Sequence, residues 1–262
     1  MDIFYTLFVI ADRDIELDSI SLAYLVIKYA LVFFLVIHFV LDTQARTLIK
    51  PALLASFAIL CGRYLLSPYE QGYWLESNLW IKGCLITLQL LGNAVIFASA
   101  YNLWGGLGRK GLELRPKDDK NPLWIYFLIP LAYTVIMTLL ATISVLSQGH
   151  SIDYGYVFSL SGSELYNLLG TITIVAVYGE IIFRIAILGA VVYLLSRFKH
   201  GFDVAIFIVA SIWALDSGNY YELHSLTYLR MLLMGITLGF LFKRFGIFIP
   251  ILCSLFFNLS PI

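Results

Sequence analysis

The chain has 262 residues, of which 60% are hydrophobic and 13% are charged. A soluble domain carries roughly one quarter charged residues, so the composition excludes an ordinary soluble domain and favours a protein whose surface lies in lipid. The 17 basic and 17 acidic residues give a formal net charge of zero. No overall positive field is therefore available to attract nucleic acid.

Hydrophobic runs long enough to cross a bilayer recur along the whole chain. About 20 residues span a hydrocarbon core of ~30 Å at a rise of ~1.5 Å per residue. With Gly, Pro and charge clusters taken as breaks, these runs predict eight helices, over residues 21–41, 51–67, 79–104, 122–147, 164–196, 202–217, 227–243 and 246–260. The predicted fold class is all-α: a polytopic membrane bundle of about eight transmembrane helices, forming one membrane domain over residues 1–262.

The fifth predicted helix, residues 164–196, is longer than one upright span requires. A helix that exceeds the bilayer thickness tilts, protrudes or breaks. Gly170 and Gly179 lie inside this helix, and we expect any break to occur at one of them.

The basic residues of the predicted loops indicate the orientation. Alternate loops hold Arg46, Lys50, Arg109, Lys110, Arg115, Lys117, Lys120, Arg197, Lys199, Lys243 and Arg244, whereas the other loops hold only Arg13. Cytoplasmic loops carry an excess of Lys and Arg. We therefore expect a multi-pass protein with its basic loops in the cytoplasm and both termini on the non-cytoplasmic side.

The cysteines and histidines do not form a pattern typical of a metal site. Cys61, Cys84 and Cys253 fall inside apolar runs at unrelated spacings, which suits neither a disulfide framework nor a zinc cluster. The histidines, at positions 38, 150, 200 and 224, are scattered over the ends of the predicted spans. We expect no metal and no cofactor.

Ionisable residues inside the predicted spans are candidates for function. Lys28, Lys82 and Arg230 lie near helix ends, where a long side chain can reach the membrane surface. Glu180 and Arg184 lie deeper, and their spacing of four puts both on one helix face with the acid first, the favourable order for pairing. Such a pair is either a structural ion pair or part of a functional site. Stability alone does not explain a buried ion pair, because an apolar pair of similar size is often as stable.

With this pair, the sequence resembles the CAAX prenyl endopeptidase and bacteriocin-processing family, the CPBP or Abi family of intramembrane glutamic proteases. The resemblance covers residues 122–262, a core that follows variable N-terminal helices in residues 1–120. The family has about eight helices, and its first motif is two adjacent glutamates, three residues and an arginine. Glu180 and Arg184 match the second glutamate and the arginine, whereas Gly179 occupies the position of the first glutamate, the general base.

The family's second motif places a Phe four residues before a His. Ile212 and Asp216 stand at these two positions. In an alternative register, Trp213 and Ser217 would stand there instead.

The last two helices carry the remaining resemblance. The family shows a glycine-rich helix and a short turn before its final span, represented in this sequence by Gly235, Gly239, Lys243, Arg244 and Gly246. Two glycines four residues apart also favour close packing of another helix. The third motif is a His four residues before an Asn; Ser254 stands at the His position and Asn258 matches the Asn.

The resemblance therefore assigns motif positions to Glu180, Arg184, Asp216, Ser254 and Asn258. A glutamic protease must deprotonate water with a base and stabilise an oxyanion with hydrogen-bond donors. Gly179 offers no base, Ser254 donates weakly, and Asp216 would repel an oxyanion if ionised. We therefore expect a catalytically degenerate member that contacts membrane lipid and binds a membrane-protein partner or a hydrophobic or lipidated peptide.

Two other functions stay open at this point. An active endopeptidase could use Glu180 and Asp216 as a rearranged carboxylate pair with split pKa values. A transporter of small solutes or lipids could line its path with Arg63, Asn93, Glu180 and Arg184, although no paired inverted repeats are evident.

Overall fold

A computed structural model describes residues 19–66, 79–107, 122, 124–147, 176–218 and 225–258. Its helices are α2 (Ser19–Leu41), α3 (Thr43–Thr47), α4 (Ile49–Leu66), α6 (Leu79–Gly106), α7 (Ile125–Ser147), the π-helix η1 (Ile181–Ile187), α10 (Leu188–Leu194), α11 (Gly201–Gly218), α12 (Ser225–Phe245) and α13 (Phe248–Asn258). Residues 176–180 form an α-helix directly before η1. No strand occurs in the described residues, so the all-helical prediction is confirmed. Each predicted helix has a counterpart, and residues 164–175 of the fifth lie outside the described residues.

Several described helices are suited to a bilayer. Three stretches are long and apolar enough to cross it: Ile86–Gly106, Ile125–Ile143 and Ala176–Leu194. Shorter apolar helical stretches are Val26–Leu41, Ile49–Cys61, Gly201–Leu215 and Phe248–Asn258. This series is that of a multi-pass membrane protein.

One face of α7 is apolar and exposed. Phe127, Leu131, Val135, Leu139 and Ile143 follow one another at intervals of four, and each is more than half exposed. Residues at this spacing share a helix face. A soluble monomer rarely exposes so large an apolar patch, whereas in a bilayer lipid chains cover it. The exposed face of α7 therefore supports the membrane bundle.

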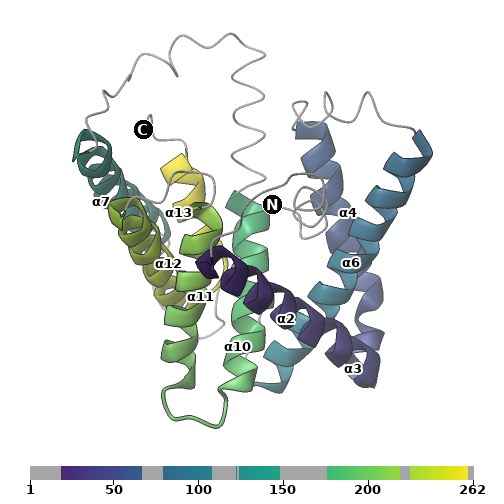
Figure 1. The fold of residues 1–262 in the computed structure, drawn as a ribbon. Coiled ribbons are helices and arrows are strands. Elements are labelled where there is room, and N and C mark those ends of the chain that lie inside the picture. Colours follow the sequence, from purple (N-terminus) through teal and green to yellow (C-terminus); the bar gives the residue numbers. More distant parts are fainter. Residues whose placement is uncertain are drawn as a thin grey trace.

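The helix formed by residues 176–180, η1 and α10 is central to the fold. In Figure 1, α10 lies between α4 and α6 on one side and α7, α11, α12 and α13 on the other, and α2 crosses in front of it. One hydrophobic cluster joins α2, α6, η1, α10 and α11, and a second joins α7, α12 and α13. Trp213 of α11 packs against both clusters.

Two glycines allow α12 to approach α11 closely. A Cβ atom at Gly235 would lie 3.0 Å from the Cα atom of Ala210, and one at Gly239 would lie 2.6 Å from Cγ2 of Ile206. Both distances are too short for a larger residue. The predicted close packing is therefore confirmed, and the packed helix is α11 of the same chain.

The predicted turn before the last span is also present. Gly246 has a φ of 82°, in the left-handed region that favours glycine after a helix. Its backbone N–H donates to the carbonyl of Phe242 at 3.0 Å. This residue ends α12 and lets α13 begin at Phe248.

Several helix ends that flank the predicted basic loops meet at one end of the bundle, which we call the basic end. The ring of Trp104, near the end of α6, contacts Phe202 at the start of α11 and Phe242 at the end of α12. Lys243 of α12 forms an ion pair with Asp203 of α11. In Figure 1 this is the lower end, where α3 and the turn between α10 and α11 also lie.

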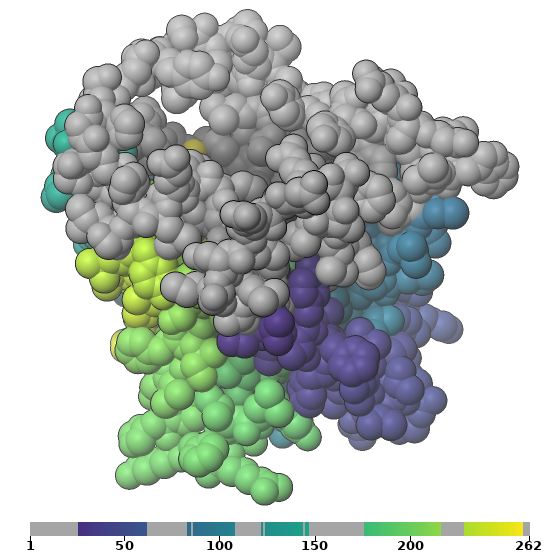
Figure 2. All heavy atoms as spheres, in the orientation of Figure 1, coloured from purple at the N-terminus to yellow at the C-terminus, as the bar shows by residue number. Residues whose placement is uncertain are grey.

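The turn between α10 and α11, residues 195–200, projects from the basic end (Figure 2). Its Phe198 is 67% exposed and stands between Arg197 and Lys199. A hollow of about 440 Å³ lies beside it, lined by Leu195, Phe198, Lys199, His200, Gly201 and Val204. An exposed aromatic ring between basic residues is typical of a membrane–water interface.

Candidate functional site

The helix that carries Glu180 and Arg184 changes from an α-helix to a π-helix between these two residues. It runs as an α-helix over residues 176–180 and continues without a break as the π-helix η1. The expected break near Gly179 is therefore a change of helix type that starts two residues later. Gly170, the other candidate position, lies outside the described residues. π-Helical turns are rare and often occur at functional sites.

A tryptophan from α6 fixes this segment. The indole Nε1 of Trp104 donates to the backbone carbonyl of Ile185, inside η1, at 2.9 Å. The indole can approach because residue 189 is glycine: a Cβ atom there would lie 2.7 Å from Nε1 of Trp104. The π segment is thus anchored by a hydrogen bond between residues 81 positions apart.

Three of the five predicted site residues meet at the Glu180 carboxylate. Oε2 of Glu180 accepts from Nε of Arg184 at 3.0 Å, and Oε1 accepts from the Ser254 hydroxyl of α13 at 2.8 Å. Glu180 is 3% exposed, Arg184 is 0% exposed and Ser254 is 7% exposed. The acid is therefore paired, hydrogen-bonded and removed from bulk solvent.

The other two predicted site residues lie at the ends of their helices. Asn258 is one turn beyond Ser254, and its amide donates to the Ser254 backbone carbonyl at 2.7 Å. Asp216 lies in the last turn of α11, and its side chain falls outside the described residues, as does that of Ser217. Ile212, at the Phe position of the second motif, is buried.

One side chain from α7 and one from α13 lie in the region of the pair. Tyr133 of α7 and Cys253 of α13 are both buried in the second hydrophobic cluster. Each is close enough to Glu180 to interact with it electrostatically. No sequence pattern singles out Tyr133, because a tyrosine on an apolar helix face has no spacing that distinguishes it from a core residue.

The residues named for a transport path are only partly described. Asn93 of α6 accepts through Oδ1 from the hydroxyl of Tyr178 at 3.3 Å. Glu180 and Arg184 pair with each other, and the side chain of Arg63 lies outside the described residues. Transport stays a prediction.

The expectation that Lys28 reaches the membrane surface was wrong. Its side chain is 2% exposed, so the ammonium group is enclosed by the bundle. Arg230 is half-buried, and the side chain of Lys82 lies outside the described residues. A position near a helix end does not place a side chain at the surface when neighbouring segments cover that end.

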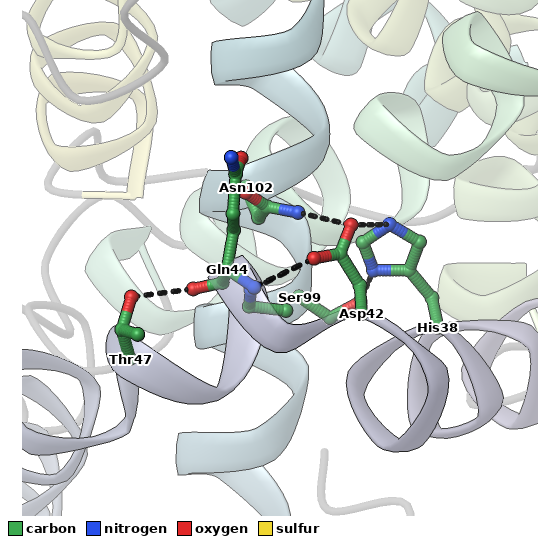
Figure 3. A network of polar contacts seen from close by, with 7 residues as sticks. His38, Asp42, Gln44, Thr47, Ser99 and Asn102 are labelled. Carbon is green, nitrogen blue, oxygen red and sulfur yellow. Dashed lines mark hydrogen bonds and ion pairs between the residues drawn. The ribbon is translucent and has the colours of Figure 1, made fainter.

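A second polar cluster, absent from the sequence analysis, lies between α2 and α6 near the basic end (Figure 3). Nε2 of His38 lies 3.6 Å from Oδ2 of Asp42, and Nδ1 of His38 lies 2.9 Å from the Ser99 hydroxyl. Asn102 donates to Oδ2 of Asp42 at 3.0 Å, and the Gln44 backbone N–H donates to Oδ1 at 2.7 Å.

The order serine, histidine, aspartate resembles a catalytic triad, but the exposure of its members does not. A triad needs a nucleophile that substrate can reach, and Ser99 is 0% exposed. Asp42 instead caps α3 as its N-terminal cap residue. The cluster is therefore a structural clamp that ties the end of α2 and the start of α3 to α6. The signal that could have found it is the spacing of four between His38 and Asp42.

A comparison with known protein families gave a match to the C-terminal part of the chain. Residues 161–260 match the family described as type II CAAX prenyl endopeptidase Rce1-like. No curated protein and no solved structure gave a significant match. The matched range contains all five predicted site residues and confirms the resemblance that the sequence motifs indicated. Residues 161–260 of this multi-pass membrane protein are therefore similar to the Rce1-like, type II CAAX prenyl endopeptidase family.

Proposed function

We propose that this protein binds a lipidated or hydrophobic peptide, free or as part of a membrane-protein partner, and does not cleave it. The observation that carries the proposal is the state of the Glu180 carboxylate. Both of its oxygens accept hydrogen bonds, one of them from a guanidinium group, and the side chain is 4% exposed. A carboxylate held in this way is not free to deprotonate a water molecule.

The neighbouring motif positions do not supply the missing chemistry. General-base catalysis requires a group that can reach the proton it removes, and position 179 is a glycine. An oxyanion is stabilised by donors aimed at it, whereas the Ser254 hydroxyl donates to Glu180. The family scaffold with these replacements supports binding without hydrolysis.

An active endopeptidase is the alternative that the family resemblance favours. It would require Glu180 to leave its present partners and act with Asp216. Asp216 lies in the last turn of α11. The experiment must therefore exclude peptide cleavage by Glu180 and Asp216.

The test uses the purified full-length chain in lipid nanodiscs and a fluorescent farnesylated peptide. Fluorescence anisotropy measures binding, mass spectrometry measures cleavage, and the same peptide without its prenyl group is the control. We expect prenyl-dependent binding with no cleavage product, in both the wild type and Glu180→Gln. Cleavage by the wild type that disappears in Glu180→Ala would show that the protein is a protease.

The orientation is part of the proposal. By the positive-inside rule, the basic end faces the cytoplasm, so both termini lie on the opposite side. A single cysteine at position 47, in a variant lacking Cys61, Cys84 and Cys253, should be protected from a membrane-impermeant maleimide in intact cells. Labelling of that cysteine before cell lysis would reverse the assignment.

A further inference from the structure

Arg184 carries more hydrogen-bond donors than its neighbours can satisfy. Its Nε donates to Glu180, but Nη1 and Nη2 have no hydrogen-bond partner in the part of the chain that the structure describes. The side chain is nevertheless 0% exposed. A buried donor without an acceptor is costly, and more so on a charged group, so proteins seldom leave one unsatisfied.

A third buried donor, this one from α7, also lacks an acceptor among the described residues. The hydroxyl of Tyr133 in α7 is buried and has no hydrogen-bond partner among the described residues. Tyr133 lies in the same buried cluster as Cys253 of α13, and the next residue of α13, Ser254, donates to Glu180. The central helix and α7 therefore each contribute unsatisfied polar atoms to one region of the bundle interior.

Charge balance decides which acceptor suits this region. The Glu180 carboxylate already neutralises the Arg184 guanidinium, at a distance of 3.0 Å. A second anion, such as a carboxylate or phosphate, would leave a net negative charge in a low-dielectric interior, which is strongly disfavoured. A neutral oxygen satisfies the N–H groups without that cost.

We propose that Nη1 and Nη2 of Arg184, together with the Tyr133 hydroxyl, form a subsite that binds a neutral carbonyl oxygen, the backbone carbonyl of a bound peptide. This inference rests on the proposed peptide-binding function and names the group by which the peptide is held. A lipid ester carbonyl has the same chemistry, so the test must separate the two sources.

Tyr133→Phe is the informative variant, because it removes one donor and retains the ring. Tyr126→Phe is its matched control: Tyr126 lies seven residues earlier on α7, is buried in the same hydrophobic cluster, and packs against Phe245. Loss of one neutral hydrogen bond corresponds to roughly 2- to 10-fold in affinity. We expect that increase in the Kd of the farnesylated peptide for Tyr133→Phe and no change for Tyr126→Phe.

The peptide is tested with a free C-terminal carboxylate and with a C-terminal amide, in nanodiscs of ether-linked phospholipid, which contain no ester carbonyl. The proposal expects the same weakening by Tyr133→Phe for both peptides. Weakening confined to the carboxylate peptide would overturn it in favour of an anion site. A loss of thermal stability in Tyr133→Phe that occurs only in ester-linked lipid, with peptide affinity unchanged, would assign the carbonyl to lipid and also overturn it.

The remaining outcomes separate this inference from the proposed function. Peptide binding that is normal in Tyr133→Phe and in Arg184→Lys overturns the subsite and leaves peptide binding intact. Absence of any peptide binding to the wild type overturns both. Because Arg184→Lys alters a buried ion pair, its fold is checked by circular dichroism, and Tyr133→Phe carries the conclusion if that variant does not fold.

Discussion

Two acid–base pairs in this protein share a spacing of four residues but differ in their surroundings. The side chains of His38 and Asp42 are 14% and 35% exposed, whereas those of Arg184 and Glu180 are 0% and 4% exposed. Asp42 accepts hydrogen bonds from Asn102 and from backbone N–H groups of α3. Arg184 retains two N–H groups with no partner among the described residues.

The difference teaches that spacing alone does not define the role of such a pair. At a helix end, backbone N–H groups and water can satisfy the hydrogen-bonding atoms that the pair itself does not use. The His38–Asp42 pair then acts as a clamp between helices. For Arg184 no described residue accepts from Nη1 or Nη2, and these two donors are the basis of the proposed subsite. The charges at Glu180 and Arg184 also carry a desolvation cost that an apolar pair would avoid, which suits a functional origin.

The largest expected effect is a gain of activity at the buried pair. Gly179→Glu/Ser254→His places a glutamate and an imidazole at the positions to which the resemblance assigns the family's base and histidine. A Cβ atom at residue 179 would meet nothing within 4 Å, so the start of the new side chain has space. We expect mass spectrometry to detect cleavage of the farnesylated peptide that is absent in the wild type.

Gly179→Gln/Ser254→His is the matched control, because it has the same shape without the base, and it should not cleave. Equal cleavage by both variants would contradict the assignment of the missing base to position 179. Failure of the glutamate variant to cleave a peptide that it still binds would also contradict it.

The second expected effect is a loss of stability when the buried pair is broken. Arg184→Met leaves the Glu180 carboxylate buried without its cation, which typically costs about 3–5 kcal/mol. The double variant Glu180→Gln/Arg184→Met removes both charges and should recover most of that loss. Denaturant unfolding in mixed micelles, followed by tryptophan fluorescence, measures the free energies of unfolding. Equal stability of the single variant and the wild type would contradict this, because it would mean that the Glu180 carboxylate does not need its cation.

A smaller effect is expected at the His38–Asp42 cluster. Ser99→Ala removes the partner of Nδ1 of His38, and loss of one hydrogen bond costs about 1 kcal/mol. Ser211→Ala is the control, because its hydroxyl bonds only a carbonyl of its own helix on an exposed surface, and we expect almost no change. A loss as large as that of Arg184→Met would mean that the clamp is as critical as the buried pair.

The smallest expected effect is a pH dependence at Asp42. Hydrogen bonds from the backbone N–H of Gln44 hold the pKa of Asp42 below its ordinary value, with smaller contributions from Ala45, Asn102 and His38. A lowered folded pKa stabilises the protein above the unfolded pKa of about 3.9, and that stabilisation is lost as pH falls through the folded pKa.

Melting temperatures of the wild type and Asp42→Asn therefore should differ at neutral pH and converge as the pH falls below about 4. A difference that stays constant across this range would show that the Asp42 charge does not contribute. Glu180→Gln, measured in parallel, separates this local dependence from any that originates at the buried pair.

The sequence could predict much of the fold and part of the candidate site. Runs of apolar residues predicted the helices, and the spacing of Gly235 and Gly239 predicted a close helix contact, which the packing against α11 confirms. The interval between Glu180 and Arg184 predicted their pairing, because both lie on one helix and i,i+4 contacts are local. The resemblance over residues 122–262 predicted the family whose model matches residues 161–260.

The burial of Lys28 could not be predicted in this way. The expectation that Lys28 would reach the surface rested only on how near the residue lies to the end of its own helix. Exposure also depends on which segments cover that part of the helix, which no local pattern contains.

By itself, the sequence determined the properties that depend on composition and local spacing: a helical membrane protein, the family resemblance of its C-terminal part, and an acid–base pair on one helix face. Tertiary structure alone decided that Ser254, 74 residues from Glu180, donates to the same carboxylate. It also decided that Arg184 is buried with two N–H donors that no described residue satisfies. The physical reason is that helix formation and bilayer insertion act on neighbouring residues. Desolvation and hydrogen bonding in the interior instead depend on which distant helices pack together.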